Sequence, residues 1–153
     1  MDIFLVCHAD TEPFAPWGDS VQPLTAQGRR QAQGLGERLR WVDCSPTHVW
    51  TSPHSYAVQT AQIVVAALGV FCELGALDEL SPGGVPHDVV VATRALPAHS
   101  AVMLVGHAGV LTDVGRQAGN DTNLAAIQTA EAVRIVDGRV RWRFAWNAEA
   151  PVS

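Results

Sequence analysis

The sequence is poor in charge, and in positive charge above all. Charged residues make up 16% of the chain, and 10 Lys and Arg stand against 15 Asp and Glu, so the formal net charge is -5 at pH 7. Arg29 and Arg30 form the only adjacent basic pair. Because nucleic-acid binding depends on basic side chains that neutralise phosphates, this composition argues against a nucleic-acid partner.

Long apolar runs and paired cysteines are also missing. No apolar run approaches the roughly 18 residues of a membrane-spanning helix, and the first predicted strand follows Met1 so closely that no signal peptide fits before it. The three cysteines, Cys7, Cys44 and Cys72, cannot all pair and show no CxxC spacing. We therefore expect a cytoplasmic protein with reduced thiols and no membrane contact.

The chain is nevertheless long and apolar enough to fold compactly. It has 153 residues, of which 48% are hydrophobic, and this composition excludes a disordered chain. A chain of this length buries roughly two thirds of the surface that its unfolded form exposes. We expect one domain that spans residues 1–153.

Apolar runs of strand length alternate with segments of helical periodicity along the chain. Thr25 is placed to cap the first helix, Gly69 to end the second, and Asp137-Gly138 to form a tight hairpin turn. The expected strands are an opening strand that ends at Cys7-His8, the segments 47–53 and 70–74, a strand within 100–109 and a hairpin over 132–146. The expected helices lie within 23–40, 56–69, 87–96 and 110–119, and a loop is expected at 78–84.

This order predicts an α/β fold. We expect a single-domain three-layer sandwich, with a mostly parallel sheet, helices on both faces and a C-terminal antiparallel hairpin. Within the hairpin, Arg139, Arg141 and Arg143 alternate with apolar residues and are interpreted as a solvated face.

Two histidines end two of the predicted buried strands. His8 follows the opening strand, and His107 follows the apolar run that begins near residue 100. The carboxyl ends of neighbouring parallel strands meet at one crevice, so the two imidazoles would face a shared ligand if their strands are adjacent. One neutral imidazole would then attack phosphorus, provided that its second nitrogen donates to a carbonyl or carboxylate, while the other donates a hydrogen bond.

Five segments carry a resemblance to a known family. In chain order they are "FLVCHADT", "PLTAQGRRQAQGLGERL", "VWTSPHSYAVQTAQIV", "LDELSPGG" and "VMLVGHAGVLTDV". Together, over about residues 2 to 118, they resemble the histidine phosphatase (phosphoglycerate mutase-like) superfamily, and in particular its short SixA-type phosphohistidine phosphatases. The resemblance implies a phosphoglycerate mutase-like fold, with His8 as the phosphorylated nucleophile and His107 as the second active-site histidine.

The sequence departs from this family at both arginines that clamp phosphate. Where the family has Arg-His-Gly, this chain has Cys7-His8-Ala9, and Tyr56 stands where the second arginine is expected. Cys7, Ala9 and Tyr56 are thus the substrate-binding positions that the resemblance implies. Neither a thiol nor a phenol carries the positive charge of the missing guanidiniums. We therefore expect an impaired SixA-like phosphohistidine phosphatase or small phosphomonoesterase, and the alternative is a catalytically silent pseudophosphatase that binds or regulates a partner.

Other residues near the predicted crevice offer partial replacements. His54, and less directly His87, would supply a weaker positive charge if protonated, so His54 is a further substrate-binding candidate. Asp78 and Glu79 are general-acid candidates only if their loop reaches the site.

A metal cluster of Cys7 with His8, His54 and His107 is disfavoured, because successive residues of a strand point to opposite faces. We expect no metal and no cofactor. The expected partner is a phosphorylated protein or a small phosphorylated ligand.

Overall fold

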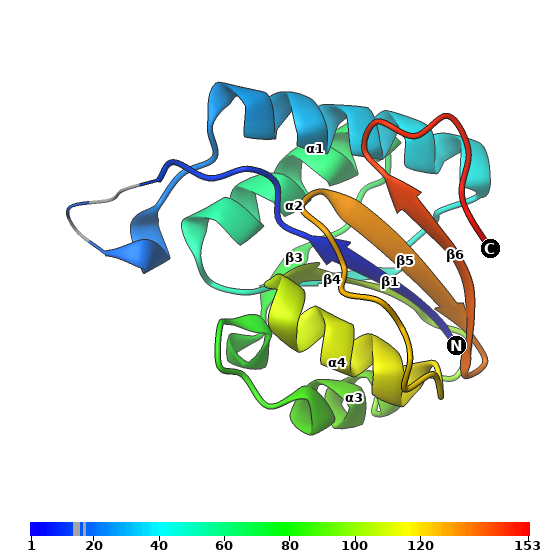
Figure 1. Cartoon of the computed structure of the whole chain (residues 1–153). Coiled ribbons are helices and arrows are strands. Elements are labelled where there is room, and N and C mark those ends of the chain that lie inside the picture. Colours follow the sequence, from blue (N-terminus) through cyan, green and yellow to red (C-terminus); the bar gives the residue numbers. More distant parts are fainter. Residues whose placement is uncertain (14–15, 17) are drawn as a thin grey trace.

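One six-stranded sheet organises the chain in the computed structural model, which describes residues 1–13, 16 and 18–153 (Figure 1). The strand order is β3-β2-β4-β1-β5-β6. The pairs β1·β4, β2·β4 and β2·β3 are parallel, while β1·β5 and β5·β6 are antiparallel. The strands are β1 Asp2–Cys7, β2 His48–Thr51, β3 Leu74–Ala76, β4 Ala101–Gly106, β5 Glu131–Val136 and β6 Arg139–Ala145.

Helices cover both faces of this sheet. The helices are α1 Ala26–Leu39, α2 Ser55–Leu68, α3 Pro86–Arg94 and α4 Ala108–Ala118. Figure 1 shows α1 and α2 on one side of the sheet and α3 and α4 on the other. The three layers and the edge hairpin confirm the predicted fold class. Among the described residues, none of the helices has the length and apolar composition that crossing a bilayer requires.

The central strand β1 is buried on both sides, and its residues alternate between two cores. Phe4 and Val6 pack with α1 and α2, whereas Ile3, Leu5 and Cys7 pack with α3 and α4. This alternation follows from the period of two in a strand. It explains why the run reads as continuously apolar in the sequence.

Three predicted boundaries, two helix caps and one hairpin turn, are confirmed. Thr25 caps α1, because its hydroxyl oxygen accepts from the Gly28 N–H at 2.9 Å. Gly69 ends α2 in the left-handed conformation with φ 74°. Asp137 and Gly138 both have positive φ, 48° and 74°, as a tight turn between β5 and β6 requires.

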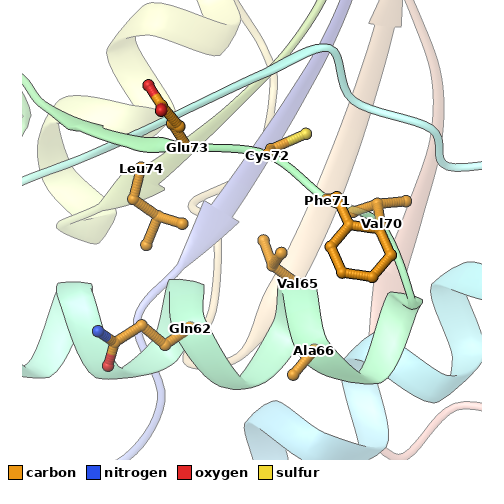
Figure 2. Close-up of a pocket in the computed structure, with 8 residues that line it drawn as sticks. All are labelled: Gln62, Val65, Ala66, Val70, Phe71, Cys72, Glu73 and Leu74. Atoms are coloured by element: carbon orange, nitrogen blue, oxygen red, sulfur yellow. The ribbon is translucent and has the colours of Figure 1, made fainter.

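The expected bounds of the strand at 70–74 are wrong, because β3 begins only at Leu74 and runs to Ala76. Residues 70–73 run past α2 without strand pairing, and Phe71 is fully exposed. Val70 and Cys72 instead pack against the core beside α2, where the Cys72 thiol donates to the Pro46 carbonyl at 3.0 Å. Figure 2 shows this segment over α2, where it borders a groove of about 520 Å³ at the amino end of β3.

Three further expectations need correction. The helix expected from residue 110 begins at Ala108, and the loop at 78–84 opens with a 3₁₀ turn, Asp78–Leu80. In the hairpin, Arg143 is not simply solvated: it donates to both carboxylate oxygens of Glu131, at 2.6 and 3.1 Å, and to the carbonyls of Ala125 and Ala126. The arginine thereby ties β6 to the segment that leads into β5.

The contact between α1 and α2 depends on Gly36. A Cβ at this position would lie 2.6 Å from the Ala67 Cβ and 2.8 Å from the Val64 carbonyl oxygen. We predict that Gly36→Ala lowers the free energy of unfolding by about 1–3 kcal/mol, because forcing the helices apart outweighs the roughly 1 kcal/mol that alanine gains in helix propensity. Urea denaturation measures this loss.

Gly34 provides the matched control in the same helix. There a Cβ would meet the end of the Arg38 side chain at 3.1 Å, the Trp146 carbonyl oxygen at 3.4 Å and the Trp146 ring at 3.9 Å, none of which is backbone of the neighbouring helix. Gly34→Ala should leave stability unchanged or raise it by up to about 1 kcal/mol. Equal effects of the two substitutions would contradict the close approach of the helices at Gly36.

Candidate active site

His8 and His107 lie side by side because their strands are neighbours. β1 and β4 pair in parallel with Cys7 opposite Gly106, so the next residue of each strand emerges at the same edge of the sheet. The two imidazole centroids are 5.6 Å apart, and the rings are inclined by 38°. This separation is within the roughly 8 Å over which two imidazoles can both hydrogen-bond one phosphate-sized anion.

The backbone around His8 is held from three directions. Its N–H donates to the Gly106 carbonyl at 3.0 Å, and its carbonyl accepts from the Ala130 N–H at 3.2 Å. The following N–H, of Ala9, donates to the Thr60 hydroxyl of α2 at 3.1 Å. The histidine therefore starts from a fixed main chain, as pre-organised catalysis requires.

The His8 ring is oriented by one hydrogen bond, between Nδ1 and the Ala9 carbonyl oxygen at 2.8 Å. A carbonyl oxygen can only accept, so Nδ1 carries the proton and Nε2 keeps its lone pair when the ring is neutral. Desolvation by burial lowers the pKa of His8, an effect that the Ala9 hydrogen bond opposes and the nearby His107 reinforces. The neutral, nucleophilic form of the ring is thereby favoured.

Tyr56, in the first turn of α2, packs against the same histidine. Its ring centroid is 4.3 Å from that of His8 and 5.3 Å from that of His54, and only 5% of the residue is exposed. Burial raises the pKa of the Tyr56 phenol, so this group stays neutral. The structure therefore places an uncharged ring beside His8.

His54 stands at the N-cap position of α2, where its side chain makes no capping hydrogen bond. Its N–H donates to the Ser52 hydroxyl at 3.2 Å. Within the described part of the chain, its buried Nδ1 has no hydrogen-bond partner. His54 thus joins the cluster of aromatic rings through Tyr56, and, in addition to burial, its proximity helps to lower the pKa of His8.

The two other positions predicted from the sequence, Cys7 and Ala9, are both buried. Cys7 is 1% exposed and faces the core next to α3 and α4, and burial raises the pKa of its thiol to about 12. A thiol in this state is neither a nucleophile nor a ready metal ligand. The N–H and carbonyl of Ala9 are already engaged by Thr60 and His8, so Ala9 supports His8 instead of offering a free donor.

The turn that contains Asp78 and Glu79 does reach His107, but through its backbone. The Leu80 carbonyl accepts from the His107 N–H at 3.4 Å, and it leaves no room for a side chain at Gly106, where a Cβ would lie 2.7 Å from that oxygen. Across the described residues, no group of three or more His, Cys, Asp or Glu is placed to hold a metal ion.

Two polar residues that support the site, Thr60 and Gln31, are not among the positions predicted from the sequence. Thr60 and Gln31 are buried and accept from backbone N–H groups of the segment after His8. The available signal was a polar side chain on an otherwise apolar helix face, as at Gln31 between Gly28 and Leu35.

The sequence of this chain is similar to those of known proteins. The family model of the histidine phosphatase superfamily (branch 1) matches residues 3–85. A protein of Klebsiella pneumoniae named "Probable phosphoglycerate mutase GpmB" is 39% identical over 72 residues, which are 45% of this chain and 33% of that protein. The chain thus matches only about a third of the length of this curated relative.

Solved structures match along nearly the whole chain. A structure of the protein histidine phosphatase SixA complexed with tungstate has a TM-score of 0.88 at 22% identity, covering 95% of this chain and 97% of that one. The alpha-ribazole phosphatase from Shigella flexneri has a TM-score of 0.73 at 17% identity, covering 100% and 98%. At these identities, the likeness establishes the fold.

The lowered pKa of His8 has a measurable consequence. We predict that its imidazole titrates below 6.5 in the folded protein, as followed by NMR. Between this folded pKa and 6.5, the unfolded chain binds more protons, so the free energy of unfolding should rise with pH across that window and lose the His8 contribution as pH falls. His8→Asn should show a smaller slope there, and a folded-state pKa at or above 6.5 would contradict the burial argument.

Proposed function

Because the chain belongs to the histidine phosphatase superfamily, we propose that it transfers a phosphoryl group from a phosphorylated protein or small ligand to water, with His8 as the nucleophile. The observation that carries this proposal is the hydrogen bond from His8 Nδ1 to the Ala9 carbonyl, which leaves Nε2 free to attack. The tungstate held by the SixA neighbour supports an oxyanion as the ligand of this fold.

The proposed reaction has two steps. The Nε2 lone pair of His8 forms a bond to phosphorus, while the bond from phosphorus to the leaving group breaks and its electron pair stays with the leaving atom. Water then attacks the phosphohistidine, the bond between Nε2 and phosphorus breaks, and the water proton passes to the released phosphate or to solvent. His107 donates a hydrogen bond to a phosphoryl oxygen during both steps.

The reaction is expected to be slow. Cys7 and Tyr56 are both neutral, and no arginine is among the groups that shift the pKa of His8 in the described part of the chain. Each lost donor to a transition state costs about 10²- to 10³-fold in rate, although the two losses need not multiply. Phosphohistidine is the favoured substrate, because a protonated imidazole leaves without much help from a general acid.

The proposal also extends to the cofactor, the extent of the domain and the cellular compartment. Side chains supply both the nucleophile and the donor, so the proposed chemistry needs no cofactor. We assign the whole of residues 1–153 to one histidine phosphatase-like domain. The three free cysteines suit a reducing compartment such as the cytoplasm.

A silent binding module is the second candidate, and the packing of Tyr56 favours it. The Tyr56 ring lies 4.3 Å from that of His8 and adds no positive charge to the site. In such a module, the two histidines would bind a phosphorylated partner without turning it over.

Hydrolysis of a labelled phosphohistidine protein and of an aryl phosphate distinguishes the two candidates. We predict that wild type releases phosphate from phosphohistidine faster than from the aryl ester, and that samples quenched at alkaline pH, where the P–N bond survives, contain phosphate on His8. His8→Ala should lose both signals, whereas His99→Ala, at an exposed histidine between α3 and β4, should lose neither. Identical rates for wild type and His8→Ala would leave only the binding module.

Restoring a cation beside His8 tests the explanation for slow turnover. We predict that Tyr56→Arg raises phosphate affinity and increases kcat at least about tenfold, because a guanidinium would replace the ring that now contacts His8. Tyr56→Phe, the matched control, should show no gain.

Adding Cys7→Arg should increase the gain when phosphate is present. Because Cys7 is 1% exposed, that variant should be less stable than wild type without phosphate and recover with it. A folded Tyr56→Arg protein that neither binds phosphate more tightly nor turns over faster would show that missing charge does not limit this site.

A further inference from the structure

One face of α1 is shaped around the backbone of Asp10, two residues after the proposed nucleophile. Thr25, Gly28 and Gln31 are spaced by three and so lie on the same side of the helix. The Asp10 carbonyl accepts from the Thr25 N–H at 3.0 Å, and a Cβ at Gly28 would lie 2.1 Å from that same oxygen. The Asp10 N–H donates to the Gln31 amide oxygen at 2.9 Å.

The bond to Gln31 acts on the same peptide unit that orients His8. The Asp10 N–H and the Ala9 carbonyl belong to one trans peptide group, in which the two point in opposite directions. With the N–H held against α1 by Gln31, the carbonyl is directed at the His8 ring, where it accepts from Nδ1 at 2.8 Å. Donation by the N–H also polarises the carbonyl and strengthens it as an acceptor.

We propose that Gln31 is a positioning residue for the nucleophile: by fixing the peptide between Ala9 and Asp10, it holds His8 in the tautomer that leaves Nε2 unprotonated. This inference rests on the proposed function for its catalytic meaning, but the tautomer itself can be observed without any turnover. The hydrogen bond shown for Gln31 is the one from the Asp10 N–H, so its proposed effect on His8 passes through that peptide.

Glutamine suits this position because it combines an acceptor with an uncharged side chain. Gln31 is 7% exposed, so water cannot readily replace its oxygen. The nearby Thr25 hydroxyl donates to the Asp10 carboxylate at 2.8 Å, and it also accepts from the Gly28 N–H at 2.9 Å. No other acceptor for the Asp10 N–H is present among the described residues.

The test compares two substitutions of Gln31 by long-range ¹H–¹⁵N correlation of the histidine rings. Wild type should show His8 protonated at Nδ1 only. Gln31→Met, which keeps the side-chain length but offers only a weak acceptor, should show a mixture of tautomers. It should also lower the pKa of His8 further, since the Ala9 hydrogen bond raises that pKa, and reduce kcat by up to about 100-fold. Gln31→Glu keeps an acceptor oxygen and should retain the wild-type tautomer.

Gln59 provides a matched control. Its amide oxygen accepts from the Leu24 N–H at 2.9 Å, which is the same kind of bond made to a different segment. Gln59→Met should leave the His8 tautomer unchanged even if it lowers stability.

Two results would overturn the proposal. One is a folded Gln31→Met protein in which His8 stays protonated only at Nδ1, and the other is a Gln31→Glu protein that loses this state. If the tautomer responds as expected while wild type shows no hydrolysis, the positioning role stands and the proposed phosphatase activity fails.

Discussion

The parallel pairing of β1 with β4 is the constraint on which the candidate site depends. Its register, with Cys7 opposite Gly106, decides that the two following histidines emerge together. A shift by one residue would exchange the two faces of β1 and send His8 toward the opposite helical layer. The buried alternation of β1 between two cores resists such a shift, so packing far from the histidines fixes their 5.6 Å separation.

Backbone hydrogen bonds after β1 then fix the orientation of the His8 ring. The carbonyl of His8 accepts from Ala130, and the next two N–H groups, of Ala9 and Asp10, reach Thr60 on α2 and Gln31 on α1. Each of these groups would be costly to bury without a partner. The loop is therefore held by both helices of one layer, and the Ala9 carbonyl is directed at Nδ1.

The sequence carries local information well and tertiary information poorly in this chain. His8, His107, the Thr25 cap and the Asp137-Gly138 turn could be predicted, because strand ends, caps and turns are set by neighbours in sequence. The start of β3 could not, since Val70 and Cys72 are apolar through packing on α2 and not through strand pairing. The contacts of Tyr56 with His8, of Arg143 with Glu131 and of Gln31 with Asp10 likewise join separate segments, and only the folded chain defines them.

A histidine phosphatase site has two electrostatic requirements, a neutral histidine and positive charge near the phosphoryl group. The described residues around His8 favour the first and do not supply the second. A nucleophilic histidine must be neutral, and here burial, reinforced by His107, achieves this by lowering the pKa of His8. Charge on the transferring phosphoryl group must also be stabilised, and for that Cys7 and Tyr56 contribute no charge. If His8 acts as the proposed nucleophile, desolvation favours its neutral form but disfavours the anion that it would attack. For the proposed phosphatase, a substrate whose leaving group is itself cationic, such as a protonated phosphoramidate, would bring part of the missing positive charge into the site, and we therefore propose that class ahead of ordinary phosphate esters.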